Sequence, residues 1–288
     1  MLVNMKEMLA DAGNRKYAIG MFDVSDLEMI RAVVEEAENL KSPVILGALA
    51  PDLENGRFEY WNALAQLAAE SVKVPVCIHL DHAANLSQIM QAAQGGFTSV
   101  MLDASAMDFE ENIRLSGEAV KAVQHMGITV EAELGHVGNG WVGSGVSESD
   151  PSAENTLTEP EKAAEFVERT GVDALAVSIG TAHGVYIKAP ELDIPRLQKI
   201  ASSTSVPLVL HGGSGTPEEQ LHNAIKNGIC KINIYSELLN AWNTEMFAEL
   251  QKQPHMAVWL CILRKKPDAA MREVIRRKLI FFNSAGKA

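Results

Sequence analysis

The residues best suited to chemistry in this sequence are histidines that follow apolar, strand-like runs. Residues 76–78 lead to the pair Asp81 and His82, while His183 and His211 follow similar runs and directly precede a glycine. An adjacent carboxylate and imidazole can supply a proton-transfer group and a metal ligand. One Asp-His pair is more often a helix cap or a loop contact, but three histidines in one setting favour a metal site. Three protein ligands with an open position are typical of catalytic zinc.

Two later segments have the composition of a phosphate site. Gly212-Gly213-Ser214-Gly215 follows His211, and Asn233-Ile234-Tyr235-Ser236 ends the next apolar run. Exposed backbone N–H groups and short hydroxyls of such loops bind phosphate in many barrels. Glycines also serve in simple turns, so the first segment alone leaves both interpretations open. Beside a metal site, the two segments predict a small phosphorylated substrate held next to a Lewis acid.

The composition excludes several classes of partner. The chain has 25 Lys or Arg against 37 Asp or Glu, whereas proteins that bind nucleic acid present basic surfaces. No run approaches about 18 consecutive apolar residues, so we expect no membrane segment. The three cysteines, at positions 77, 230 and 261, lack paired spacing, which argues against disulfides and Cys-based zinc sites. We therefore expect a cytoplasmic protein in a reducing compartment.

Apolar runs alternate with amphipathic segments along the whole chain, and this alternation predicts an α/β fold. The expected pattern is a (β/α)₈ TIM barrel that forms a single domain over residues 1–288, with an N-terminal capping helix over 2–12. A doubly wound open sheet is the alternative. The predicted strands are 17–22, 44–46, 76–80, 99–102, 128–134, 174–179, 207–210 and 230–234, and the predicted helices between and after them are 26–39, 58–72, 86–94, 108–126, 159–170, 194–202 and 217–227.

The polar residues favour the barrel over the open sheet. Eight of them lie at or just past the predicted carboxyl ends of strands, which converge on one face of a closed barrel. They are Asp23, Asp81, His82, Asp103, Glu133, His183, His211 and Asn233.

Two segments stand apart from the repeating pattern. Residues 135–155 form a Gly- and Ser-rich stretch longer than most connections, which indicates a flexible active-site loop. The segment 264–282 is basic, and we interpret it as a solvated helix in preference to a binding element for a phosphorylated ligand.

The motifs in their order resemble those of the class II, zinc-dependent ketose-bisphosphate aldolases, which include fructose- and tagatose-bisphosphate aldolases. The resemblance extends from about residue 3 to the end of the chain. The matching segments are 79–82, 109–113, 130–135, 180–184, 211–215, 231–233 and 284–288.

The resemblance implies reversible aldol cleavage of a phosphorylated ketose to dihydroxyacetone phosphate and an aldehyde, through a zinc-stabilised enediolate. It implies one zinc ion per chain on His82, His183 and His211, with Asp81 as the proton-transferring acid and Glu133 as a ligand for a displaced metal. Cobalt or manganese could replace zinc, and a monovalent cation would be an additional cofactor. The family also implies a homodimer or homotetramer. The phosphate group is expected near Gly184, Gly212, Gly213, Ser214, Asn233, Ile234, Tyr235 and Ser236.

Several positions depart from the family pattern and bear on substrate choice. Asp23 stands where the family has Asn, and Gly47 and Leu49 replace a Gln and a Ser. A carboxylate gained and a hydroxyl lost predict an aldehyde half other than glyceraldehyde 3-phosphate, with Asp23 in contact with substrate. Ala104 and Tyr235 differ as well.

The long loop lacks the usual acidic residue at Asn139-Gly140-Trp141. Glu148, Asp150 and Glu154 are therefore candidates to reprotonate the enediolate.

Two alternative functions are a non-catalytic sugar-phosphate-binding barrel and a barrel metallohydrolase, although the latter would need more carboxylate ligands.

Overall fold

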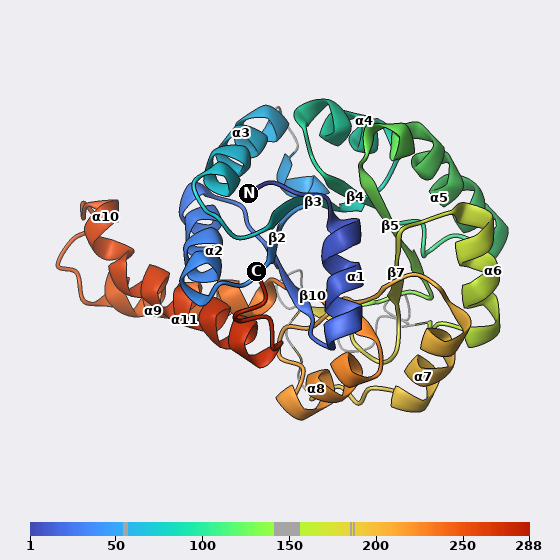
Figure 1. Cartoon of the computed structure of the whole chain (residues 1–288). Coiled ribbons are helices and arrows are strands. Elements are labelled where there is room, and N and C mark those ends of the chain that lie inside the picture. Colours follow the sequence, from blue (N-terminus) through green and yellow to red (C-terminus); the bar gives the residue numbers. More distant parts are fainter. Residues whose placement is uncertain (54–56, 141–155, 185, 187) are drawn as a thin grey trace.

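The computed structural model describes residues 1–53, 57–140, 156–184, 186 and 188–288 (Figure 1). Eight parallel strands close into a barrel in the order β1-β10-β9-β7-β5-β4-β3-β2. The closed ring confirms the predicted (β/α)₈ barrel, and the open sheet is wrong because β1 pairs with both β2 and β10. Within the described residues, no helix combines the length and apolarity that a bilayer span requires.

Every predicted strand and helix is present, with ends shifted by at most three residues. The barrel strands are β1 (Ile19–Asp23), β2 (Val44–Leu49), β3 (Val76–Ala83), β4 (Ser99–Leu102), β5 (Thr129–Leu134), β7 (Ala174–Val177), β9 (Leu208–Leu210) and β10 (Ile229–Ile234). The α-helices are α1 (Met5–Arg15), α2 (Leu27–Leu40), α3 (Arg57–Glu70), α4 (Leu86–Gly95), α5 (Phe109–Val123), α6 (Pro160–Thr170), α7 (Ile194–Ser203), α8 (Glu218–Lys226), α9 (Ser236–Gln251), α10 (Leu260–Leu263) and α11 (Lys265–Phe281). Short 3₁₀ turns cover Ala50–Leu53 and Gln124–Met126, and β6 (Asn139–Gly140) pairs with β8 (His183–Gly184) in a separate small sheet.

Two apolar clusters hold the fold together. The larger one lies between the outward-facing strand residues and the surrounding helices, as the alternation of side chains along a strand requires. The smaller one fills the amino-terminal half of the barrel interior, where Ile19, Ile45 and Cys77 meet Met5 and Leu9 of α1. Figure 1 shows α1 lying across this end of the barrel. The interior is thus closed at one end, and chemistry is confined to the other.

Helix α1 differs from its predicted bounds because Gly13 does not end it. The helix continues to Arg15 and ends at Lys16, which has a left-handed φ of 54°. A Cβ atom at Gly13 would lie 3.3 Å from Cys230 Sγ. The glycine therefore permits close packing of α1 on β10, and the breaker signal in the sequence is misleading.

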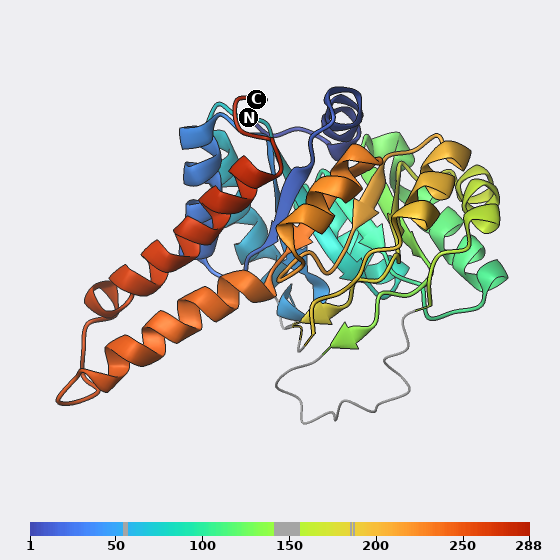
Figure 2. The same ribbon diagram turned by 90° about the horizontal axis from the view of Figure 1, so that it is seen from below.

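The basic carboxyl-terminal segment is a helix, as predicted, but one of its faces is packed against the protein instead of being solvated. Helix α11 buries Met271, Ile275 and Leu279. Its basic side chains also pair with acidic neighbours, since Arg276 lies 2.9 Å from Glu36 of α2. Figure 2 shows α11 and α9 running side by side and projecting beyond the barrel as an arm. The sequence analysis missed α9, which supplies half of this arm.

The predicted flexible loop over 135–155 is described only in part. Residues 141–155 lie outside the described residues, as do the candidate acids Glu148, Asp150 and Glu154. The preceding residues 139–140 form β6, which pairs with the strand that contains His183. The start of this loop is therefore joined directly to a candidate ligand.

Candidate metal centre and active site

Three histidines from three different strands converge at the carboxyl end of the barrel. His82 comes from β3, His183 from β8, and His211 directly follows β9. Their ligand nitrogens all lie within 4.8 Å of one another. The structure therefore brings together the three residues that the sequence analysis named as metal ligands.

The backbone at His82 turns its ring into this cluster. Successive side chains of a regular strand point to opposite faces, yet His82 has a φ of 50° and the pairing with β4 shifts register between Leu80 and Ala83. Such a left-handed conformation is costly for a non-glycine residue and is often found at functional sites. His82 Nδ1 then lies 2.8 Å from Asp103 Oδ2, which leaves Nε2 facing the cluster.

His211 has the same arrangement with its two nitrogens exchanged. Its Nε2 lies 2.9 Å from Glu131 Oε1, and its Nδ1 lies 3.0 Å from His82 Nε2. Both imidazoles thus have one nitrogen bound to a carboxylate and the other directed at a common point. This carboxylate–histidine arrangement is typical of metal ligands.

His183 completes the set with a ring nitrogen that has no hydrogen-bond partner among the described residues. This nitrogen, Nε2, is buried, which is a costly state unless another group binds it. Burial, reinforced by the charge of His82, lowers the pKa of His183 to about 3. Burial also lowers the pKa of His211. Neutral imidazole is the form that binds a cation, so these residues fit a zinc ion.

The protonation of His82 is set by its two acidic neighbours. Burial alone would lower its pKa, but Asp81 and Asp103 outweigh burial and raise the pKa to about 10. The two carboxylates therefore favour a positive charge on or next to the His82 ring, and a metal cation could supply that charge as well as a proton.

Glu133 lies beside this cluster and forms a second candidate set of ligands with His82 and Asp103. Its Oε1 accepts a hydrogen bond from the Val137 N–H at 2.9 Å, whereas Oε2 is buried without a partner among the described residues. Burial, with a contribution from Asp103, raises the pKa of Glu133 to about 8. Glu133 could therefore bind a cation through Oε2, while Oε1 stays bonded to the backbone.

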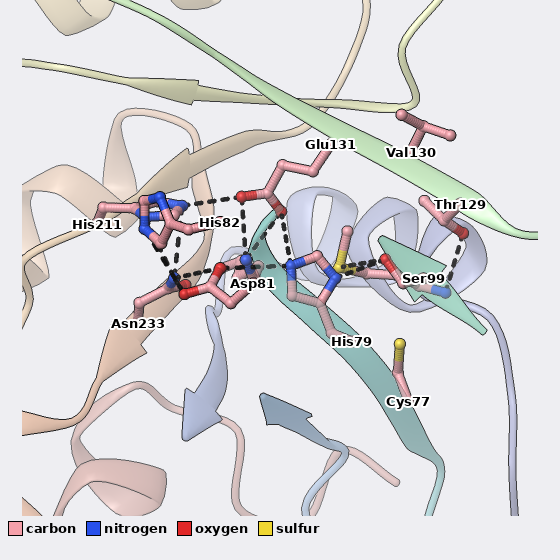
Figure 3. Close-up of polar contacts among 12 residues, drawn as sticks. Cys77, His79, Asp81, His82, Ser99, Thr129, Val130, Glu131, His211 and Asn233 are labelled. Atoms are coloured by element: carbon pink, nitrogen blue, oxygen red, sulfur yellow. Dashed lines mark hydrogen bonds and ion pairs between the residues drawn. The ribbon is translucent and has the colours of Figure 1, made fainter. Parts of the chain in front are cut away.

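Asp81 is almost fully buried next to the histidines, as Figure 3 shows. Its carboxylate lies 3.5 Å from His79 Nε2 and 3.7 Å from His82 Nε2, and Asn233 Nδ2 is 3.4 Å from both carboxylate oxygens. Burial would raise its pKa, but the charge of His82 and the hydrogen bond from His79 hold it well below the usual range. Asp81 is therefore ionised, which is the form of a carboxyl group that can accept a proton.

Asp23 occupies the same rim from the end of β1. It is 4% exposed, and its Oδ1 has no partner among the described residues. A Cβ atom at Gly47 would lie 2.5 Å from this oxygen, so the glycine leaves space that the carboxylate uses. Burial and the neighbouring Asp81 raise the pKa of Asp23 well above its usual value. Arg264, the first residue of the basic segment 264–282, does not pair with Asp23. It pairs with Asp26 and Asp268.

The predicted phosphate segments meet beside His211. A Cβ atom at Gly212 would lie 2.4 Å from the Ala182 carbonyl oxygen, so the segment that follows β9 packs tightly against the residue before His183. Ser214 Oγ accepts hydrogen bonds from the N–H groups of Tyr235 at 3.0 Å and Glu237 at 3.3 Å. The first turn of α9, with Ser236, therefore opens next to this segment, where a helix amino terminus favours anions.

The predicted phosphate residues do not all contribute side chains. Ile234 is fully buried in the outer apolar cluster, so only its backbone faces the site. Gly184 adopts a φ of 104°, a conformation that glycine tolerates, and it continues the small sheet beside His183. Asn233 is directed toward Asp81 instead of toward the glycine segment.

The sequence analysis missed three buried polar residues beneath the site. Glu131 and Lys231 form an ion pair, and His79 lies 4.0 Å from Glu131 Oε2. The period of a strand could have identified them, because each stands two residues before a predicted site residue and so faces the same interior. The pairs are Glu131 with Glu133, Lys231 with Asn233, and His79 with Asp81.

Comparison with known proteins adds independent evidence. The family model described as fructose-bisphosphate aldolase class-II matches residues 3–287. A fructose-bisphosphate aldolase from Geobacillus stearothermophilus is 40% identical, with 100% of this chain and 99% of that protein covered. A sulfofructosephosphate aldolase from Alkalicoccus urumqiensis is 38% identical, with 99% and 98% covered. The crystal structure of the YdjI aldolase from Escherichia coli K12 has a TM-score of 0.87 at 40% identity over 100% of both chains.

Proposed function

The chain belongs to the class II fructose-bisphosphate aldolase family, and from this premise we propose that it uses zinc on His82, His183 and His211 to cleave a phosphorylated ketose. The products are dihydroxyacetone phosphate and an aldehyde. The observation that carries the proposal is the convergence of three imidazoles beside an ionised, buried Asp81. When bound, the metal supplies Lewis-acid polarisation of the ketone and neutralises the charge that cleavage leaves on the ketone fragment.

The donor set supports zinc in particular. Three imidazole ligands with an open position are the usual catalytic zinc arrangement, with the metal in place of the proton that Asp81 and Asp103 favour on His82. Cobalt or manganese fits the same imidazoles. Glu133 would approach the ion only if the ion moved away from the three histidines. In the present conformation, Glu133 Oε1 accepts a hydrogen bond from the Val137 N–H. We also propose a monovalent cation as an additional cofactor, and the only support for it is the family resemblance.

Asp81 performs the proton transfer. In cleavage, its carboxylate removes the proton from the hydroxyl on the carbon that becomes the aldehyde; in condensation, it returns that proton. His79 and Asn233 lie on either side of the carboxylate and hold it toward the histidines. Asp81 is ionised and nearly excluded from water, so its carboxylate is in the form that can accept the substrate proton.

Aldolases can also use a lysine that forms a Schiff base with the ketone, and the site geometry argues against that mechanism here. Lys231 is the fully buried lysine in the barrel, and its Nζ lies 3.0 Å and 2.8 Å from the two oxygens of Glu131. We expect that dihydroxyacetone phosphate and borohydride leave the mass of the chain unchanged. A stable adduct on Lys231 would contradict the metal mechanism.

The two halves of the substrate have different surroundings. The phosphate next to the ketone would bind the segment 212–214, Gly184 and the first turn of α9, including Ser236. The aldehyde half would face Asp23, Gly47 and Leu49, since Leu49 is the register partner of Asp81. The burial and the Asp81 charge that raise the pKa of Asp23 also disfavour a second negative group, such as a phosphate, at this end. We therefore propose a ketose 1-phosphate whose far end carries no phosphate.

Two assays test this function. Zinc content per chain and a coupled assay for dihydroxyacetone phosphate should agree, and thorough chelation should abolish turnover. Substrates are then compared by kcat/KM, with fructose 1,6-bisphosphate and tagatose 1,6-bisphosphate against ketose 1-phosphates that have an uncharged or a carboxylated end. Full turnover after chelation would refute the metal mechanism, whereas a bisphosphate as the best substrate would refute only the proposed specificity.

The family match and the intact Asp81 disfavour a non-catalytic barrel, and the phosphate segments disfavour a metallohydrolase. We further propose a single-domain, cytoplasmic enzyme that forms homodimers or homotetramers. The oligomer is supported by large apolar side chains of the arm, such as Phe247, Trp259 and Ile262, each more than half exposed. Light scattering of the purified protein measures the mass of the assembly directly.

A further inference from the structure

The barrel interior contains a buried ion pair directly beneath the proposed zinc site. Glu131 and Lys231 are both fully buried, and Lys231 Nζ lies 3.0 Å and 2.8 Å from Glu131 Oε1 and Oε2. Figure 3 shows Glu131 between His211 on one side and His79 on the other. Neither Glu131 nor Lys231 belongs to the groups of residues that could hold the metal.

A structural role alone explains this pair poorly. Burying two charges costs several kcal/mol of solvation, and well-packed apolar residues of similar volume often stabilise a core as well or better. Apolar residues would also fit at this depth, since the adjoining interior layer includes the apolar cluster under α1. A function that requires a carboxylate at this depth would account for its presence.

The contact with His211 identifies that function. Glu131 Oε1 accepts a hydrogen bond from His211 Nε2 at 2.9 Å, and this bond places the ring proton on Nε2. The lone pair is then on Nδ1, the nitrogen that lies 3.0 Å from His82 Nε2 in the ligand cluster. Without the acceptor, His211 could present Nδ1–H to the cluster and would no longer be a ligand.

Lys231 supports this arrangement from the opposite side. Its ammonium group contacts both oxygens of Glu131, so it fixes the carboxylate plane and balances its charge. The two residues come from β5 and β10, and His211 follows β9, so three separate strands define the orientation of one ring.

We propose that Glu131, held by Lys231, is the positioning residue that fixes the orientation and tautomer of His211 for metal binding. This inference rests on the proposed zinc site and adds a requirement to it. Partners of this kind typically contribute 10–100-fold to metal affinity, and a charged acceptor increases the basicity of the ligand more than a neutral one does.

The experiment measures zinc affinity by chelator competition in two double variants. Glu131→Leu with Lys231→Met removes the acceptor and leaves no unpaired buried charge, whereas Glu131→Gln with Lys231→Met keeps a neutral acceptor. We expect zinc binding about 10–100-fold weaker in the first variant and an intermediate loss in the second. The visible spectrum of the cobalt form should change in the same order, because it reports the ligand field. The control is Glu36→Gln, which weakens the ion pairs of the buried Glu36 with Arg272 and Arg276 outside the barrel and should leave zinc affinity within about twofold.

The outcomes separate this inference from the function on which it rests. A wild-type protein that binds no zinc would refute both. Tight zinc binding by the wild type, with unchanged affinity and cobalt spectrum in the folded Leu/Met variant, would refute the positioning role alone. If the Leu/Met variant fails to fold, the Gln/Met variant decides, because wild-type affinity there would show that the charge on Glu131 has no effect.

Discussion

Asp81 and His82 are adjacent in the chain, and we propose opposite tasks for them, one exchanging a proton and the other binding a cation. A regular strand would send their side chains to opposite faces. The left-handed backbone at His82 cancels that alternation, so that its Nε2 lies 3.7 Å from the carboxylate of Asp81. A local conformational cost therefore places the proposed acid and the proposed metal ligand side by side.

The role proposed for Asp81 is tested by Asp81→Asn. The amide keeps the shape of the side chain but cannot accept the substrate proton, and such groups typically contribute about 10²–10⁴ in rate. We expect kcat to fall by that factor while zinc content and melting temperature stay close to wild type. Asp108→Asn is the matched control, since it changes an exposed cap of α5 where Asn serves equally well. Loss of zinc together with activity would instead indicate a structural role for Asp81.

Substrate choice is tested by Asp23→Asn, which removes the buried carboxyl group and leaves its volume. Burial and Asp81 already raise the pKa of Asp23, so negative charge is unfavourable at this rim, and a second phosphate would add more of it. Like charges brought together at a binding site can cost several kcal/mol. We expect kcat/KM for fructose 1,6-bisphosphate to rise by about tenfold or more relative to a ketose 1-phosphate with an uncharged end. An unchanged ratio would show that Asp23 does not face the aldehyde half.

Individual site residues were predictable to different degrees. His82, His183 and His211 were identified because each follows a strand-like run, and their convergence follows from the closure of the barrel. The contacts of Glu131 and Lys231 could not be predicted from the sequence. The interior layer that a residue occupies depends on the register between strands. That register comes from the packing of the whole sheet.

Helix α1 acts as a plug at the scale of elements. Met5, Leu9 and Ala12 are fully buried against the amino-terminal ends of the strands. The backbone N–H of Met5 also reaches Thr129 Oγ1 at 3.2 Å, which ties the helix to β5. This single helix therefore separates the apolar half of the interior from solvent.

The contribution of this plug is measured with Leu9→Ala. Removing a fully buried leucine side chain typically costs about 2–5 kcal/mol, because the cavity closes only in part. We expect a loss of unfolding free energy in that range, measured by denaturant titration. Leu67→Ala on α3, where the side chain is 65% exposed, should stay within about 0.5 kcal/mol of wild type. Equal effects of the two changes would show that α1 is not part of the core.

The barrel elements were predictable because their apolar periods are strong, whereas helix α9 and the short strands β6 and β8 were not. Helix α9 buries little, with Leu238 as its fully buried residue, so its sequence shows no clear apolar face. Strands β6 and β8 have two residues each, too few for any period, and they form only because the chain is brought together beside His183. Both failures concern elements that depend on tertiary contacts.

At the scale of the whole molecule, the proposed metal should stabilise the fold as well as the reaction. A ligand present at about 1,000 times its Kd adds about 4 kcal/mol to the unfolding free energy. We expect chelation to lower the melting temperature by several degrees and added zinc to restore it. His183→Ala should show a much smaller response, because it removes one ligand. An identical melting curve with and without zinc would contradict tight binding to the native state.

The division of the barrel interior into an apolar and a polar half has a consequence for how the enzyme can be altered. Asp23 and Gly47 stand one layer above Met21 and Ile45, which belong to the apolar cluster under α1. A saturation library at positions 23, 47 and 49 would therefore explore new aldehyde acceptors while the anchoring layer stays intact. Catalysts for unfamiliar carbon–carbon bonds could be selected from such a library with few variants lost to misfolding.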